Sequence, residues 1–206
     1  MKRDEKKAAG RLQKRIVTSE DIVVVVDEYF AFTVGSLCVD RHSDAVSMSE
    51  EWTATGVGVY VPPRWGSDII ALVLAAKNEE NPNRSCAVDM FSLFHLTRVR
   101  TMPLPQDIIL RVMAIATYLG KFESEFNVRD AEYLALAEAL GCEIWTTSKP
   151  FKERMDNITR QAVFEEYLNP YGTSNEPSLT RIGDRSGYSY TKVDVRQLAT
   201  RVVYLN

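Results

Sequence analysis

Apolar runs and helical repeats alternate along this chain. Ile22-Val-Val-Val-Val26 is an unbroken β-branched run, which is typical of a central parallel strand buried on both faces. Elsewhere, apolar residues recur at three- and four-residue spacing and predict amphipathic helices. The expected strands are Ile22–Val26, Gly56–Val61, Arg98–Arg100, Glu143–Thr146 and Arg201–Leu205, and the expected helices are 28–38, His42–Ala54, Trp65–Lys77, 85–97, Asp107–Leu119, 131–140 and Pro150–Leu168.

This alternation predicts an α/β fold with a mainly parallel sheet covered by helices. In such a sheet the carboxyl ends of the strands share one edge, where ligands bind. Asp27 ends the first strand, Asp68 lies in the first turn of a helix, and Asp130 is expected at the N-cap of the next-to-last helix. We therefore expect these three carboxylates to converge at that edge.

Converging carboxylates repel one another unless a cation neutralises them, and so the cluster predicts a divalent-metal site. The chain has two histidines and three cysteines, with no Cys-x-x-Cys pair, which argues against zinc. Oxygen ligands favour Mg²⁺ or Mn²⁺.

Composition indicates an ordinary globular protein. With 206 residues the chain is most simply one domain, and no apolar run is long enough to span a bilayer. The charged start lacks the apolar core of a signal peptide, and three widely spaced cysteines suit a reducing compartment, so we expect a cytoplasmic protein. The net charge of -3 gives no overall nucleic-acid signature.

Two segments fall outside the periodic pattern. Residues 1–20 form a basic arm, which is either simply solvated or a nucleic-acid contact. Residues 169–194 are rich in Asn, Gly, Ser and Tyr and have no periodicity. Their interleaved basic and aromatic residues suit single-stranded nucleic acid and suit a protein interface equally well.

The acidic residues and their surroundings resemble the PIN-domain family, particularly the VapC-type toxins of bacterial and archaeal toxin–antitoxin pairs. In that family an aspartate follows an apolar strand, a second acid opens a helix, a third acid begins an Asp-Ala-x-Tyr-x-Ala-Leu-Ala helix, and a fourth ends the following strand. The corresponding segments here are Val-Val-Val-Asp27, Val61-Pro-Pro-Arg-Trp-Gly-Ser-Asp68, Asp130-Ala-Glu-Tyr-Leu-Ala-Leu-Ala137 and Trp145-Thr-Thr-Ser148.

The resemblance covers residues 21–157, with 201–205 as the last strand of the family. It implies a three-layer α/β/α domain over residues 21–206, preceded by the basic arm and carrying an insertion at about 158–198. It departs from the family at two positions: Asp68 stands where a glutamate is usual, and Ser148 stands in place of the fourth acid.

The family chemistry implies that Asp27, Asp68 and Asp130 hold one or two Mg²⁺ or Mn²⁺ ions, and that a metal-bound water attacks an RNA phosphodiester. Ser148 would only orient that water. The resemblance also implies a cognate antitoxin and a homodimer.

Two hypotheses follow from these residues. The first is a metal-dependent endoribonuclease of the VapC type. Because a serine supplies no charge, the second is a PIN-like protein with weakened or lost catalysis that serves as an RNA- or protein-binding subunit. Three nearby acids, Glu132, Glu153 and Asp156, are candidates to compensate for Ser148.

Overall fold

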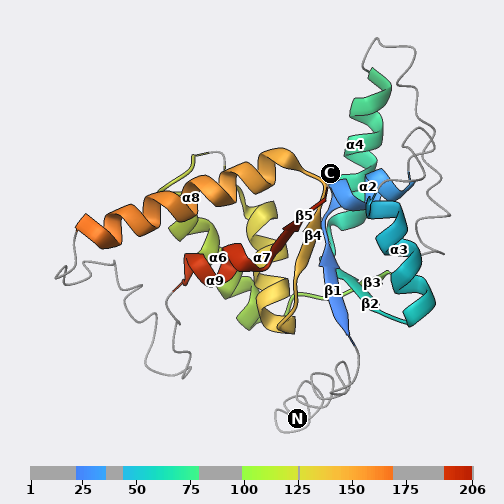
Figure 1. The fold of residues 1–206 in the computed structure, drawn as a ribbon, viewed down its shortest axis with the longest axis horizontal. Coiled ribbons are helices and arrows are strands. Elements are labelled where there is room, and N and C mark those ends of the chain that lie inside the picture. Colours follow the sequence, from blue (N-terminus) through green and yellow to red (C-terminus); the bar gives the residue numbers. More distant parts are fainter. Residues whose placement is uncertain (1–21, 36–43, 79–98, 125, 169–192, 206) are drawn as a thin grey trace, which may run out of the picture.

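The computed structural model describes residues 22–35, 44–78, 99–124, 126–168 and 193–205 (Figure 1). Their five strands form one sheet in which every pair of neighbours is parallel, in the order β3-β2-β1-β4-β5. The strands are β1 (Val23–Val26), β2 (Gly58–Val61), β3 (Arg100–Thr101), β4 (Ile144–Thr146) and β5 (Val202–Tyr204).

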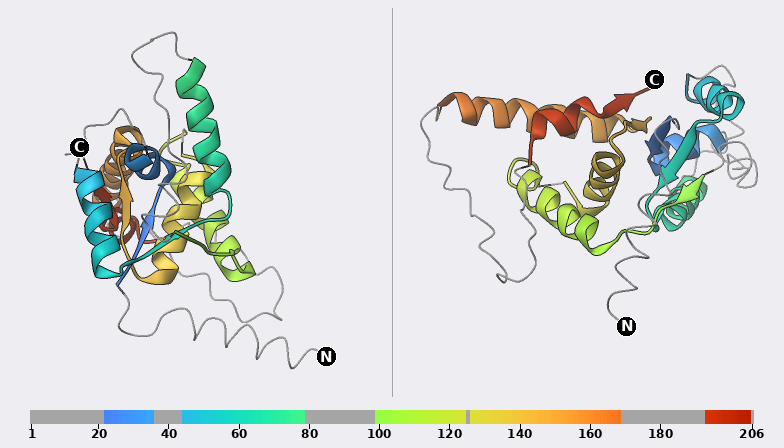
Figure 2. Two further views of the ribbon diagram at one scale, coloured as in Figure 1. Left: turned by 90° about the vertical axis from the view of Figure 1, so that its right-hand side faces the viewer. Right: turned by 90° about the horizontal axis from the view of Figure 1, so that it is seen from below.

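Helices cover both faces of this sheet, which confirms the predicted α/β class and its three layers. Helices α2, α3 and α4 lie on one side, and α6, α7, α8 and α9 lie on the other (Figures 1 and 2). Their bounds are α2 (Glu28–Gly35), α3 (Asp44–Thr55), α4 (Trp65–Asn78), α6 (Gln106–Leu119), α7 (Val128–Leu140), α8 (Lys149–Leu168) and α9 (Val195–Thr200).

The order of the strands reverses at β1. The chain proceeds outward from β1 through β2 to β3, then crosses back and adds β4 and β5 on the other side of β1. Val25 and Val26 pair with Ile144 and Trp145 at this junction. Open α/β sheets commonly bind their ligands at the carboxyl ends of the strands where the strand order reverses.

Helix α7 packs against this junction. Its inward residues include Ala131 and Ala135, which are almost fully buried, and their small side chains allow the helix to approach β1 and β4 closely. Gly141 ends the helix in the left-handed conformation, with φ of 69°, which glycine adopts without steric cost. The predicted stop at Gly141 is therefore confirmed.

One described helix was not predicted, and three of the predicted segments cannot be compared with the structure. Helix α9 was not predicted; Asp194 caps it by accepting a hydrogen bond from the backbone N–H of Gln197 at 3.1 Å. Helix α8 (Lys149–Leu168) agrees with the predicted helix Pro150–Leu168. The basic arm 1–20, the expected helix 85–97 and most of the polar segment 169–194 lie outside the described residues.

None of the helices in the described part of the chain is both long and apolar enough to cross a membrane.

Candidate acidic active site

Four helices begin at the carboxyl-terminal edge of the sheet. Helices α2, α4 and α8 follow β1, β2 and β4, and α7 begins there before the chain enters β4. The N-terminus of a helix has unpaired N–H groups and partial positive charge, which favour carboxylates. Glu28, Asp68 and Asp130 lie in the first turns of α2, α4 and α7. The fold thus gathers acidic side chains at this edge, as the sequence predicted for Asp68 and Asp130.

Asp27 links the two central strands. It follows β1, is 4% exposed, and accepts a hydrogen bond on Oδ1 from the backbone N–H of Phe30 at 2.8 Å, so that it caps α2. Its Oδ2 accepts a short hydrogen bond from the hydroxyl of Thr146 at the end of β4. Burial and the nearby charge of Glu28 raise the pKa of the Asp27 carboxyl from 3.8 to about 8.

This raised pKa predicts a pH-dependent stability that Asp27→Asn removes. Between about pH 4 and pH 8, Asp27 is protonated in the folded protein and ionised in the unfolded chain, so unfolding releases a proton. The protonated Asp27 carboxyl contributes fully to the free energy of unfolding below about pH 4, and this contribution is lost as the pH rises to about 8. Urea unfolding in EDTA should therefore show wild type losing stability relative to Asp27→Asn across this range; parallel pH profiles would contradict the buried, protonated carboxyl.

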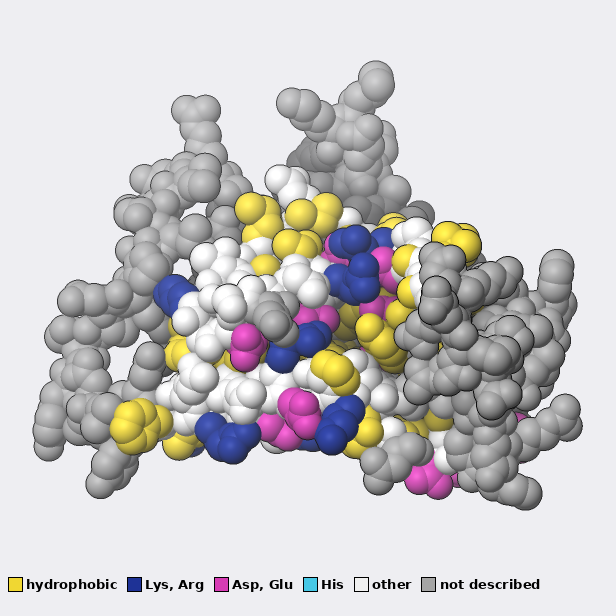
Figure 3. All heavy atoms as spheres, turned by 90° about the horizontal axis from the view of Figure 1, so that it is seen from above, with side chains coloured by type: hydrophobic (Ala, Val, Ile, Leu, Met, Phe, Trp, Pro, Cys, Tyr) yellow, Lys and Arg dark blue, Asp and Glu magenta, His cyan; other side chains and the backbone are white. Residues whose placement is uncertain are grey.

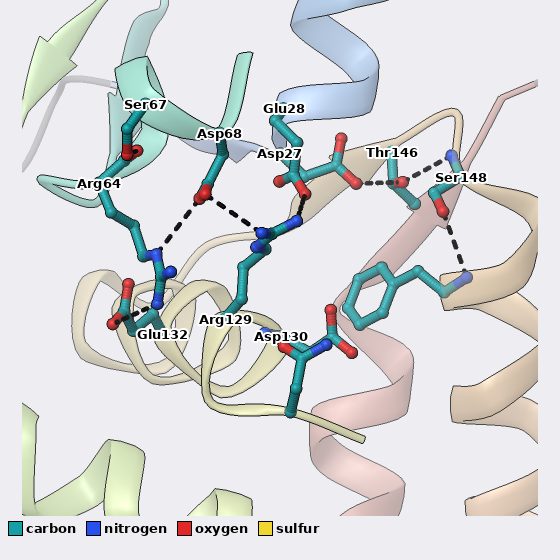
Figure 4. Close-up of polar contacts among 12 residues, drawn as sticks. Asp27, Glu28, Arg64, Ser67, Asp68, Arg129, Asp130, Glu132, Thr146 and Ser148 are labelled. Atoms are coloured by element: carbon teal, nitrogen blue, oxygen red, sulfur yellow. Dashed lines mark hydrogen bonds and ion pairs between the residues drawn. The ribbon is translucent and has the colours of Figure 1, made fainter. Parts of the chain in front are cut away.

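Arg129 bridges acidic residues of two helices. Its Nη1 lies 3.2 Å from Oε1 of Glu28, and its Nη2 lies 3.3 Å from Oδ1 of Asp68. Both acids are 3% exposed, whereas about a third of the Arg129 side chain is exposed. The guanidinium therefore stands between two buried carboxylates, as Figure 4 shows. On its other oxygen, Oδ2, Asp68 lies 3.4 Å from Nε of Arg64.

Asp130 does not cap α7, in contrast to the prediction. The helix begins one turn earlier at Val128, and Asn127 is the cap, accepting a hydrogen bond on Oδ1 from the backbone N–H of Asp130 at 3.0 Å. This leaves the Asp130 side chain available for Nη2 of Arg154, which lies 2.9 Å from its Oδ2. Burial raises the pKa of the Asp130 carboxyl, and the charge of Arg154 opposes that rise.

Ser148 stabilises the start of α8. Its hydroxyl oxygen accepts a hydrogen bond from the backbone N–H of Phe151 at 3.3 Å, and its own N–H donates to the Thr146 hydroxyl at 2.8 Å. Thr147 pairs with Thr33 of α2, with 2.8 Å between the hydroxyl oxygens. The Thr-Thr-Ser turn therefore lies at the carboxyl end of β4, as predicted, and connects this strand with α2 and Asp27.

Glu28 and the arginines of the site were not identified from the sequence. Glu28 directly follows Asp27, and neighbouring residues of a strand point to opposite faces. Only the immediate start of α2 brings both side chains to the same edge. The only indication of Arg129 in the sequence is its position directly before Asp130 in the motif. Its partners lie on α2 and α4, so these ion pairs could be identified only from the fold.

The carboxylates of the site are chemically suited to a divalent cation, but in the structure they are paired with arginines. Carboxylate oxygens are the preferred ligands of Mg²⁺, and Oδ2 of Asp68 is buried and accepts no hydrogen bond, although it is ion-paired with Nε of Arg64 at 3.4 Å. Among the described residues, however, no three His, Cys, Asp or Glu side chains are grouped so that they could hold an ion. Figure 3 shows basic side chains lying among acidic ones on this face. An ion bound by Glu28 and Asp68 would therefore have to replace Arg129.

Comparison with known proteins finds no family model and no curated protein that matches this chain. Membership of the PIN family therefore stays a prediction that depends on the sequence motifs.

Proposed function

We propose that this protein is a metal-dependent endoribonuclease of the PIN type. The observation that supports it best is the burial of Asp27, Glu28, Asp68 and Asp130, each less than a tenth exposed, at the edge where the strand order reverses. Burying several carboxyl groups is costly even where arginines pair with them, and packing of the core does not require it. Acids brought together at such a cost favour a site that binds a cation and a charged substrate.

In this proposal Asp27, Asp68 and Asp130 would hold Mg²⁺ or Mn²⁺. A bound divalent cation supplies activation of water and stabilisation of the charge that develops on a phosphodiester. Thr146 fixes the orientation of the Asp27 carboxyl through its hydroxyl. Arg64, whose side chain is 42% exposed and which lies beside Asp68, would contact an RNA phosphate.

The partners in this proposal come from the resemblance to VapC-type toxins. They are an RNA substrate, a cognate antitoxin protein and a second copy of the chain, in the cytoplasm.

A second function is favoured by the arginines of the site. Arg129 bridges Glu28 and Asp68, and Arg154 pairs with Asp130, so the acids already have counter-ions. With Ser148 in place of a fourth acid, the protein would then be a PIN-like RNA- or protein-binding subunit whose catalysis is weakened or lost.

An RNA-cleavage assay separates these two functions. Metal-stripped protein is incubated with a pool of labelled single-stranded RNA, with and without Mn²⁺, and binding is followed in parallel by fluorescence anisotropy. We expect cleavage that requires Mn²⁺ and stops when EDTA is added. Binding without cleavage at millimolar Mn²⁺ would favour the binding subunit and contradict the nuclease.

A further inference from the structure

Tyr29 is a partly exposed aromatic residue in the first turn of α2, directly after Asp27 and Glu28. It is 39% exposed, whereas its neighbour Phe30 is 1% exposed and stacks on Trp52 in the core, with 5.3 Å between the ring centroids. Because the side chains of a helix tilt toward its N-terminus, the Tyr29 ring extends toward the carboxyl-terminal edge of the sheet. Tyr29 therefore presents an aromatic surface to solvent beside the acidic residues.

Two observations place this ring where α2, α7 and α8 begin. Thr33 lies one turn after Tyr29 on the same face of α2, and its hydroxyl pairs with that of Thr147, just before α8, at 2.8 Å. Burial raises the pKa of the Tyr29 hydroxyl, and the charges of Arg129 and Arg154 oppose that rise. These arginines belong to α7 and α8. The Tyr29 ring therefore lies at the edge of the sheet that these three helices share (Figure 1).

Lys149 supplies an exposed cation at the same edge. It is the first residue of α8, two residues after Thr147, and its side chain is 72% exposed. Its Nζ lies 3.6 Å from Oε1 of Glu153, whose side chain is 60% exposed, and solvent screens such a pair. Glu153 therefore lies at the surface and does not compensate for Ser148. The ammonium group of Lys149 stays accessible to an anion.

The acids of the site do not prevent a phosphate chain from approaching, because arginines pair with them. Arg129 pairs with Glu28 and Asp68, and Arg154 pairs with Asp130. Proteins that bind single-stranded nucleic acids combine cationic groups along the backbone with aromatic side chains on which the bases stack. In duplex RNA the bases stack on one another and are not free to do so. An exposed ring next to an exposed ammonium group therefore suits one nucleotide of a single strand.

We infer that Tyr29 stacks on one base of a single-stranded RNA and that Lys149 binds a neighbouring phosphate. The inference rests on the proposed RNA binding, which the nuclease and the RNA-binding subunit share, and it does not require a metal ion. Tyr29 is then the residue that favours single-stranded over duplex RNA.

Fluorescence anisotropy with the full chain tests the role of Tyr29. The protein is titrated in EDTA into a labelled single-stranded RNA of mixed sequence. Stacking of one base contributes enough that Tyr29→Ala should bind at least about fivefold more weakly than wild type. Tyr29→Phe keeps the ring and should bind like wild type. Phe164→Ala is the matched control, because it removes an aromatic side chain that is 61% exposed near the other end of α8, and it should also bind like wild type.

The salt dependence of the same binding tests the role of Lys149. Loss of one phosphate contact should make the slope of log affinity against log salt shallower by about 0.7 in Lys149→Ala. Tyr29→Ala should keep the wild-type slope, because the ring carries no charge. Lys152→Ala is the control: Lys152 pairs with Asp156 at 2.7 Å on the same helix and should keep the slope. If Lys152→Ala changes the slope as much as Lys149→Ala, the effect is one of general charge, and Lys149 has no specific role.

Melting temperatures in EDTA establish that each variant folds. Tyr29→Leu keeps an apolar side chain without an aromatic ring, and it decides the question if Tyr29→Ala does not fold. It should bind single-stranded RNA at least about fivefold more weakly than wild type. Wild-type affinity in Tyr29→Leu would overturn the stacking.

A parallel titration with the duplex of the same RNA checks the preference for single strands. Tyr29→Ala should bind the duplex as tightly as wild type does, because no base of the duplex is free to stack on the ring. Equal losses of affinity for single-stranded and duplex RNA would show that the ring does not bind a base.

The outcomes separate the inference from the proposed function. If wild type binds single-stranded RNA and Tyr29→Ala binds it equally tightly, the inference is wrong and the proposed function stands. If binding depends on Tyr29 but wild type does not cleave RNA with Mn²⁺, the inference stands and the nuclease is wrong. If wild type binds no RNA, both are wrong.

Discussion

Asp130→Asn should reduce Mn²⁺-dependent RNA cleavage by at least about 100-fold. The change removes the negative charge of a proposed metal ligand while keeping nearly the same volume in a position that is 8% exposed. It also leaves Arg154 without its carboxylate partner, and so we expect a loss of about 1–2 kcal/mol in the free energy of unfolding. Initial rates of cleavage at saturating Mn²⁺ measure the first effect, and urea unfolding measures the second.

Asp156→Asn is the matched control for Asp130→Asn. Asp156 is also an aspartate in an ion pair, with Lys152 of the same helix, but its side chain is about half exposed. It should cleave RNA at the wild-type rate. Equal rates in wild type and Asp130→Asn would show that the observed cleavage does not depend on this site.

Arg129→Ala should destabilise the metal-free protein, and Mn²⁺ should reverse the loss. Without the guanidinium, Glu28 and Asp68 are buried close together with no shared counter-ion. Removing one partner of a fully buried pair costs about 3–5 kcal/mol; because the Arg129 side chain is 35% exposed, we expect about 2 kcal/mol. Urea unfolding at pH 7 in EDTA measures this loss. A divalent cation takes over the neutralising charge, so Mn²⁺ should bind about tenfold more tightly than to wild type.

Arg111→Ala controls for the loss of an arginine elsewhere. Arg111 of α6 binds Glu138 of α7, with 2.6 Å between Nε and Oε2, away from the sheet edge. This variant should also have a lower free energy of unfolding, but Mn²⁺ should raise that free energy no more in Arg111→Ala than in wild type. If Mn²⁺ stabilises Arg129→Ala no more than Arg111→Ala, then Arg129 does not occupy the position of a cation.

The ion pairs of Arg129 and Arg154 would have a different role in each of the two proposed functions. In a nuclease, Arg129 and Arg154 hold the acids in place until a cation arrives, and the cost of displacing them lowers cation affinity. In a binding subunit, the same pairs are the final arrangement and stabilise the edge of the sheet. The response of Arg129→Ala to Mn²⁺ therefore distinguishes a latent metal site from a permanent ion-pair network.

Much of the fold follows from local patterns. The run Val23–Val26 is β-branched throughout and specifies a buried central strand, and the alternation of strands and helices specifies a parallel sheet. Gly141 marks the end of α7 because the required left-handed backbone favours glycine. The assignment of Asp130 as the cap failed because Asn127, another good capping residue, lies one turn earlier.

The sequence by itself determined the class of fold and the placement of Asp27 and Asp68 at the carboxyl-terminal edge of the sheet, because these depend on periodicity and on strand and helix ends. The tertiary structure decided which side chains each carboxylate contacts. Arg129 reaches Glu28 across 101 residues of sequence, and Thr146 reaches Asp27 across 119. Such contacts depend on the angles at which α2, α4 and α7 leave the sheet, which are set by packing of the whole core and are not encoded in any short segment.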